Sequence, residues 1–295
     1  MNAESSVKAA SSGAWAARLN GTELATVEAV GFRAIGVAMG MSIYRDVVYT
    51  GYPAGRGYGS PISRPASASQ RFYPCPHGSN SLGHAPGLNY RQTWTQSPRR
   101  MALKHVLDKL VADGRSMGAH AVIGISVQQS KFMDGEPPIR QIRMTGTAVR
   151  AEGGENNAHG RLFTTTLSAG DLLALLLTGR TPLEITFGNA VVAVMPGCVL
   201  RHSKRAKGIV EITQLGDASE MAREAAVADL RADAAKASAT DVVGIELDLD
   251  SALPPRAGAG WAAVHAYAMG TAVRRFENGL DQVGAQQIFR LVNRP

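Results

Sequence analysis

A short stretch of this chain occurs twice at a constant spacing. Residues 119–127 (AHAVIGISV) align with residues 239–247 (ATDVVGIEL) at an offset of 120. Further on, GTAVR at 146–150 recurs at 270–274, at an offset of 124. A long internal period is typical of a chain built from copies of one structural module. With 295 residues, each copy is long enough to bury a core of its own.

The start of each copy carries the signals of a short helix. Asn20 precedes the acidic residue Glu23 by three positions, and Ser168 precedes Asp171 in the same way. At this spacing the first side chain caps a free backbone N–H, and the acid favours the positive end of the helix dipole. A glycine stands eleven residues after each capping residue, where a left-handed residue commonly ends a helix.

The remaining pattern predicts a strand, a long helix and two more strands in each copy. The first strand is expected at 34–44 in copy one and at 190–200 in copy two, because both are rich in Val, Ile and Met. Ser97-Pro98 predicts the start of the first long helix, and residues 217–236 form an alanine-rich counterpart. The fold class is therefore α+β, with two tandem α/β sandwich modules. We expect a disordered tail at 1–14, copy one at 15–152, a linker at 153–161, copy two at 162–276 and a C-terminal tail at 277–295.

Copy one contains an insertion at residues 49–96 that is rich in Gly, Pro, Ser and aromatic residues and has no Asp or Glu. Loops of this length are usually functional or disordered. Interleaved arginine and aromatic side chains can stack on bases or on a protein surface. Because the insertion has no lysine cluster, we expect a protein partner and regard nucleic acid as the lesser alternative. The candidate partner-binding residues are Tyr52, Arg56, Tyr58, Arg71, Phe72, Tyr73, Tyr90 and Trp94.

Two strand-forming segments resemble a known family. Gly118 to Ile125 and Gly146 to Val149, together with the run at 30–44, are similar to the YbjQ family, whose members are labelled as heavy-metal-binding. The resemblance covers about 19–150 and 162–276. It implies YbjQ-like α/β sandwich modules and a ring-shaped homo-oligomer, commonly a pentamer.

Three groups of residues are candidates for a metal site, with a divalent metal as the possible cofactor. The candidate ligands are Cys75, His77 and His84 in the insertion, Cys198 and His202 after a strand, and Glu246, Asp248 and Asp250 at alternate positions of one strand. None has paired C-x-x-C spacing. The alternatives are a loop that happens to contain these residues, a buried cysteine, and a strand that is solvated or forms an inter-subunit salt bridge to arginines such as Arg143 or Arg274.

Motifs of the common enzyme classes are absent from the sequence, including a nucleophile elbow, a His-Glu-x-x-His pair and a phosphate-binding loop. We therefore expect a non-enzymatic oligomeric scaffold or interaction protein. Heavy-metal binding is the first alternative, and the net charge of +7 leaves sequence-independent nucleic-acid binding as the second. Two distant cysteines, no secretory signal and no apolar run long enough to span a bilayer predict a cytoplasmic protein.

Overall fold

The computed structural model describes residues 19–45, 70–74, 87–92, 98–133, 139–152, 162–195, 197–198, 211–252 and 262–275. Within these residues the order helix, strand, helix, strand, strand occurs twice, and the predicted α+β class is confirmed. We call residues 19–152 the first half and residues 162–275 the second half. The first half contains α2 (Gly21–Ala29), β1 (Phe32–Arg45), α3 (Pro98–Ser116), β4 (Ala121–Met133) and β5 (Ile139–Ala151). The second half contains α4 (Ala169–Leu177), β7 (Arg180–Met195), α6 (Thr213–Lys236), β8 (Asp241–Ala252) and β9 (Ala262–Arg275).

Each half contributes to the sheet of the other. In the described residues the first sheet has the order β1-β5-β4-β6, and its strand β6 (Phe163–Thr164) comes from the second half. The second sheet has the order β2-β3-β7-β9-β8, and β2 (Gln70–Tyr73) and β3 (Gly87–Gln92) come from the insertion of the first half. The two halves are therefore joined by backbone pairing in both directions.

The predicted starts and ends of the two short helices, α2 and α4, are confirmed. The Asn20 side chain accepts a hydrogen bond from the Glu23 N–H at 2.9 Å, and the Glu23 carboxylate accepts one from the Asn20 N–H at the same distance. Ser168 Oγ likewise accepts from the Asp171 N–H at 3.2 Å. The glycines that follow, Gly31 and Gly179, have φ values of 78° and 74°, as the left-handed end of a helix requires.

Two predicted boundaries in the second half were wrong. Strand β7 begins at Arg180 and not at 190, and α6 begins at Thr213 and not at 217. Pro182 and the polar residues around it conceal the start of β7 in the sequence, but the register of β7 against β9 shifts directly after Pro182. Such an irregularity accommodates a proline inside a strand.

Close helix packing fixes how the two halves correspond. A side chain at Gly40 of β1 would collide with the backbone of α3 around Val106, and one at Gly188 of β7 would collide with the backbone of α6 around Ala226. The counterpart of Gly40 is thus Gly188, so β1 and β7 correspond at an offset of 148, and residues 190–200 are not the counterpart of 34–44. Along the long helices the offset of 120 holds, because Val106 corresponds to Ala226.

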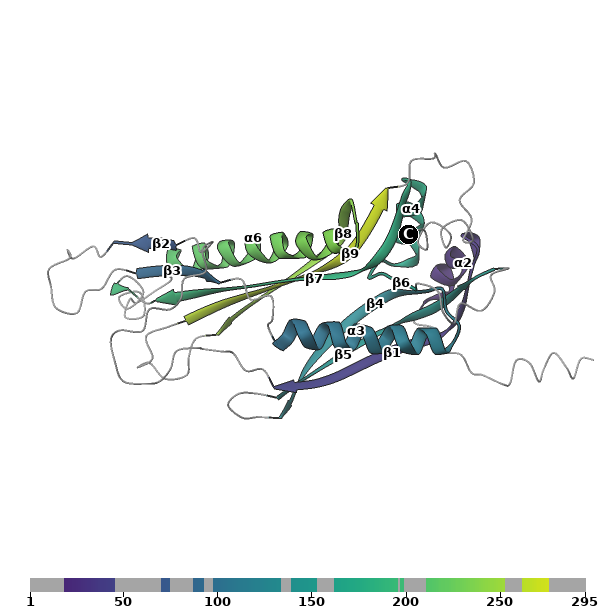
Figure 1. Ribbon diagram of the computed structural model, residues 1–295, viewed down its shortest axis with the longest axis horizontal. Helices are drawn as coiled ribbons and strands as arrows, with labels where there is room; N and C mark the ends of the chain where they lie inside the picture. The colour runs from purple at the N-terminus through teal and green to yellow at the C-terminus, as the bar shows by residue number, and fades with distance from the viewer. Residues whose placement is uncertain are drawn as a thin grey trace, which may run out of the picture.

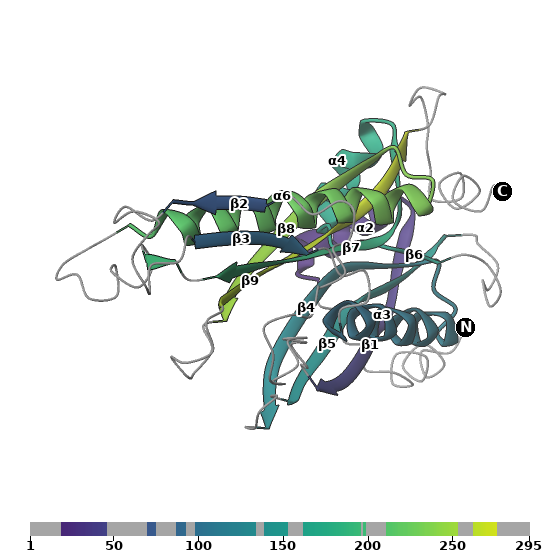
Figure 2. The same cartoon turned by 60° about the vertical axis from the view of Figure 1, so that its left-hand side comes forward.

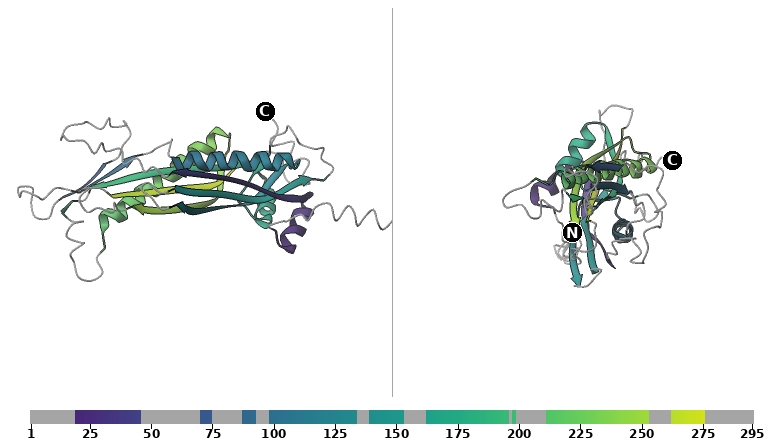
Figure 3. Two further views of the ribbon diagram at one scale, coloured as in Figure 1. Left: turned by 90° about the horizontal axis from the view of Figure 1, so that it is seen from below. Right: turned by 90° about the vertical axis from the view of Figure 1, so that its left-hand side faces the viewer.

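The molecule is a stack of layers in the order α6, second sheet, α3, first sheet (Figure 1). Helix α6 buries its alanine face on the second sheet, and α3 buries its apolar face on the first. Ile185 and Phe187 of β7 belong to the cluster around α3. The second sheet is thus covered by α6 on one face and by the first half on the other, as Figures 2 and 3 show from other directions. None of the described helices is long and apolar enough to cross a membrane.

Candidate functional site: the junction between the two halves

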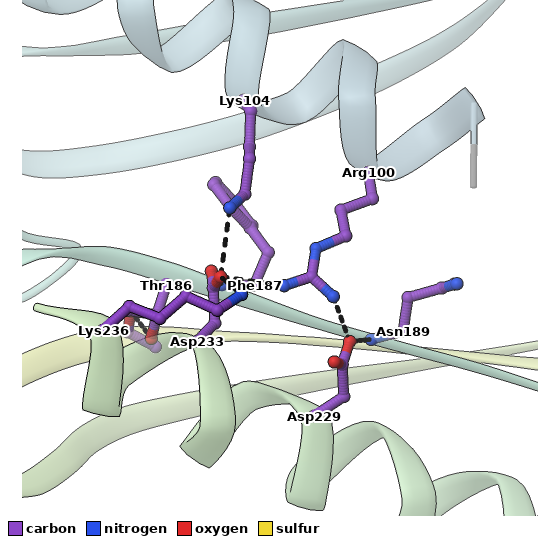
Figure 4. A network of polar contacts seen from close by, with 9 residues as sticks. Arg100, Lys104, Thr186, Phe187, Asn189, Asp229, Asp233 and Lys236 are labelled. Carbon is purple, nitrogen blue, oxygen red and sulfur yellow. Dashed lines mark hydrogen bonds and ion pairs between the residues drawn. The ribbon is translucent and has the colours of Figure 1, made fainter. Parts of the chain in front are cut away.

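Cations on α3 meet carboxylates on α6 at the centre of the stack (Figure 4). Arg100 pairs with Asp229 and, at 2.9 Å, with Asp233. All three side chains are buried, with exposed fractions of 5%, 14% and 7%. Lys104, one turn along α3, reaches the same Asp233 oxygen as Arg100 at 3.0 Å. Buried charges are tolerated when they are paired and hydrogen-bonded, so this network fixes how the two halves dock.

Asp229 and Asp233 also accept hydrogen bonds from the backbone of β7. Asp229 accepts a hydrogen bond from the Asn189 N–H at 3.0 Å, and Asp233 accepts one from the Phe187 N–H at 3.3 Å. Burial alone raises the pKa of Asp233, but the hydrogen bonds from Lys104 and from the Phe187 N–H, with the charge of Arg100, outweigh burial and lower it. Asp233 therefore stays ionised at neutral pH.

A second contact joins the start of α3 to the far edge of the second sheet. The Arg99 guanidinium lies 3.4 Å from the centre of the Tyr267 ring and donates a hydrogen bond to Asp248 at 2.8 Å. Arg140 of β5 approaches Asp250 of β8 at 3.9 Å. An open cavity of about 400 Å³ lies between these pairs. It is lined by Arg99, Val127, Gln129, Arg140, Asp248, Leu249 and Asp250.

The acidic strand that the sequence offered as a hard-cation site thus faces arginines. Asp248 and Asp250 are ion-paired to Arg99 and Arg140 of the same chain, whereas the expected salt bridge was to arginines of another subunit. Glu246 lies on β8 and is exposed. No group of three His, Cys, Asp or Glu side chains that could hold a metal occurs among the described residues. Cys198 is a buried thiol, while Cys75, His77, His84 and His202 lie outside the described residues.

Part of the insertion docks on the second half of its own chain. Tyr73 donates a hydrogen bond to Asp217 of α6 at 2.6 Å, and its hydroxyl accepts one from Asn89 Nδ2 at 3.0 Å. Asn89, which is fully buried, also donates to the Gln214 carbonyl at 2.7 Å. Burial and the contact with Asp217 raise the pKa of Tyr73. This hairpin therefore extends the second sheet and stabilises the tandem arrangement.

The predicted partner-binding residues are divided by this docking. Tyr90 is buried, Arg71 lies 3.6 Å from the Asp217 carboxylate, and Tyr73 is engaged as above. Phe72 points outward with an exposed fraction of 67%. Tyr52, Arg56, Tyr58 and Trp94 lie outside the described residues.

The residues that form the junction were missed by sequence reasoning. Arg100, Lys104, Asp229 and Asp233 were not among the candidate residues. A signal did exist in the repeat, since an offset of 120 places Lys109 opposite Asp229 in the alignment, and Arg100 opposite Glu220. Charges that change sign between copies indicate that the copies face different neighbours.

Known proteins resemble this chain over part of its length. Residues 90–152 match the YbjQ_1 family model, described as "Putative heavy-metal-binding". This segment contains α3, β4 and β5, so a YbjQ-like domain is present in the first half. The chain is also 27% identical over 201 residues to "Encapsulin nanocompartment protein Rv1762c" of Mycobacterium tuberculosis, a match that covers 67% of this chain and 71% of the relative. No solved structure matches the chain.

Proposed function

We propose that this chain is a non-enzymatic structural protein that assembles with copies of itself, and that its halves are two diverged YbjQ-like modules. The recurring order of elements and the corresponding close contacts at Gly40 and Gly188 support the second module. The family-model match covers only the first.

One observation carries the proposal of self-assembly. Both ends of the layered stack present large apolar side chains to solvent, at positions whose counterparts are buried in the junction. Met39 on β1 is 50% exposed, whereas its counterpart Phe187 is 2% exposed. Ile245 on β8 is 44% exposed, whereas its counterpart Ile125 is 3% exposed. Exposed apolar surface of this kind marks sites of protein association.

The name of the M. tuberculosis relative refers to a nanocompartment. Because the two chains are similar, we propose that this chain is also part of a large protein assembly. The resemblance to the YbjQ family further suggests a ring-shaped homo-oligomer, commonly a pentamer. Light scattering and native mass spectrometry test the proposal directly. We expect a single assembly of several chains, and a chain that remains monomeric at high micromolar concentration would refute self-assembly.

The exposed Phe72 is the described residue that best fits a further protein partner. It lies on β2, the edge strand of the second sheet, where another chain can approach. If this edge binds a partner, Phe72→Ser leaves the self-assembled particle intact and removes the partner from a defined co-purified complex. Loss of the particle itself would assign Phe72 to self-assembly instead.

Heavy-metal binding is the second candidate, because the family description names it. The ligands would include residues outside the described part of the chain, such as Cys75 and His77. Elemental analysis of protein purified without an affinity tag decides between the two. A stoichiometric metal that is lost in Cys75→Ser would favour the metal function, and a metal-free particle would exclude a tightly bound structural ion.

A further inference from the structure

Each half has two faces that can bind a neighbour, and the junction uses one from each. The inner helix-side face, on the first half, contains Arg99, Arg100, Lys104, Ile125 and Val127. The inner sheet-side face, on the second half, contains Phe187, Asn189, Asp229, Asp233 and Met269. These two faces bury each other. The corresponding faces of the opposite halves point outward.

The residues of the two outward faces are the counterparts of the inner-face residues at the offsets between the halves. The outer helix-side face, on the second half, contains Ser219, Glu220, Glu224, Ile245 and Leu247. The outer sheet-side face, on the first half, contains Met39, Met41, Lys109, Asp113 and Thr145. Local geometry on the outer sheet-side face repeats that of the inner one. Asp113 accepts a hydrogen bond from the Met39 N–H at 2.8 Å, as Asp233 does from Phe187.

The central ion pair has opposite polarity on the two sets of faces. In the junction the helix-side residue is the cation Arg100 and its partner is Asp229. On the outer faces the helix-side counterpart is the anion Glu220, and the counterpart of Asp229 is the cation Lys109. Both outer residues are exposed, and Lys109 donates to the Met41 carbonyl at 2.9 Å. The outer faces are thus complementary in charge as well as in apolar surface.

We propose that the outer helix-side face of one chain binds the outer sheet-side face of another copy, with Glu220 opposite Lys109. This proposal rests on the self-assembly proposed above and names the surfaces that carry it. The contact is head-to-tail, so each chain keeps one free face of each kind and assembly continues until a ring closes. In such a ring each module contacts the next through the same kinds of face. The cation of the central pair lies on the helix-side face within a chain and on the sheet-side face between chains.

The reversal of charge also excludes incorrect pairings. If the halves of one chain separated, its helix-side cation Arg100 would meet Lys109 of another copy. The outer anion Glu220 would in turn meet Asp229. Both mismatches place like charges where the junction has an ion pair, and like-charge juxtaposition discriminates strongly against a wrong partner. The reversal therefore disfavours the binding of an inner face to an outer face.

Other charged groups lie on or beside these faces. Glu220 forms an ion pair with Arg223 on α6 at 2.6 Å, with both side chains about half exposed, so Glu220 remains reachable from solvent. Arg143 of β5 stands where the second half has Tyr267 and adds a cation to the outer sheet-side face. Glu224 and Asp113, the counterparts of Lys104 and Asp233, are the exception, since both are acidic. Asp113 accepts a hydrogen bond from the Met39 N–H of β1, which stabilises its charge.

Charge-reversal variants of the full chain test the proposal. Lys109→Glu and Glu220→Lys are each expected to weaken assembly by about tenfold or more, because each creates a like-charge contact. Glu28→Lys on α2 and Arg115→Glu on α3 change the net charge equally away from both faces, and they should assemble as wild type does. Circular dichroism and thermal melting establish that every variant is folded.

Two rescue experiments distinguish a specific pair from general charge effects. The double variant Lys109→Glu/Glu220→Lys restores the pair with opposite polarity and should recover most of the assembly. Mixing the two single variants should also restore assemblies that contain both chains, which native mass spectrometry can detect. If wild type assembles but neither rescue succeeds, the pairing of Glu220 with Lys109 is refuted while self-assembly stands. If wild type is monomeric, the proposed function itself fails.

Discussion

Neutralising Asp233 is the most direct test of how the halves are held together. In Asp233→Asn the side chain keeps its size and can still accept a hydrogen bond from the Phe187 N–H, but its charge is lost. Arg100, which is 5% exposed, then keeps Asp229 as its anionic partner. Breaking a buried ion pair costs about 3–5 kcal/mol when the remaining charge is uncompensated. Because Asp229 still compensates Arg100, we expect the free energy of unfolding to fall by about 2–3 kcal/mol at pH 7.

The lysines around Asp233 contribute less to this loss. Lys104 is 48% exposed and Lys236 is 70% exposed, so both can turn to water when the carboxylate is neutralised. Exposed ion pairs contribute about 0–1 kcal/mol each. The matched control is Asp113→Asn in the first half. Asp113 holds the Met39 N–H in the same way, but the described residues place no cation within ion-pair distance of it. Its replacement should cost less than about 1 kcal/mol.

The pKa of Asp233 gives this prediction a pH dependence. Because the folded chain lowers the pKa, the unfolded chain binds more protons at mildly acidic pH. The stabilisation is complete above the unfolded pKa of about 3.9 and is lost as the pH falls through the lower, folded pKa. Urea unfolding at a fixed chain concentration, at pH 7 and at pH 3, should show that the difference between wild type and Asp233→Asn shrinks in acid. Equal losses at both pH values, or an equal loss in Asp113→Asn, would contradict the reasoning.

Three further predictions concern the packing of β7, the outer faces and the contact made by Arg99. Gly188→Ala should lower the free energy of unfolding, measured with urea, by about 1–3 kcal/mol, because its Cβ would lie 2.7 Å from the Leu230 N atom. The control is Gly216→Ala on α6, whose Cβ meets no atom within 4 Å and which should stabilise the chain by up to about 1 kcal/mol. Glu224→Lys should lower the concentration needed for assembly in light scattering, because it recreates the cation that Lys104 supplies in the junction; weaker assembly would count against the outer-face correspondence. Arg99→Leu should destabilise the chain by about 1–3 kcal/mol by thermal or urea melting, since it removes the ring contact and the hydrogen bond to Asp248; unchanged stability would show that this contact is incidental.

Local signals in the sequence were sufficient for the helices of the first half. Capping residues act over three or four positions, so Asn20 with Glu23 and the proline at 98 predict helix starts without knowledge of the rest of the fold. Strand β7 was harder, because Pro182 and Glu184 interrupt its apolar pattern near an irregularity in register. Pairing with β9 allows Pro182 and Glu184 to lie within a strand, and β9 is far away in the sequence.

Local sequence signals could not predict the strands of the insertion or the contacts of the junction. Nothing local in residues 70–74 or 87–92 indicates that they extend a sheet built by residues a hundred positions further on. Tyr73 and Asn89 gain their roles from Asp217 and Gln214, which the fold alone brings near. The acidic strand shows the same limit, since alternate carboxylates are equally suited to a cation, to water or to arginines. Only the position of α3 and β5 against β8 determines that Asp248 and Asp250 face Arg99 and Arg140.

The correspondence between halves gives the exposed surfaces their meaning. A single exposed methionine on a strand is ordinary, because much of any protein surface is apolar. Met39 differs because a residue at the same place in the other half, Phe187, is buried against a neighbouring module. The same reasoning applies to Ile245 and Ile125. Each half is thus a control for the other, and a position that is buried in one and exposed in the other marks a contact that a second copy of the chain can complete.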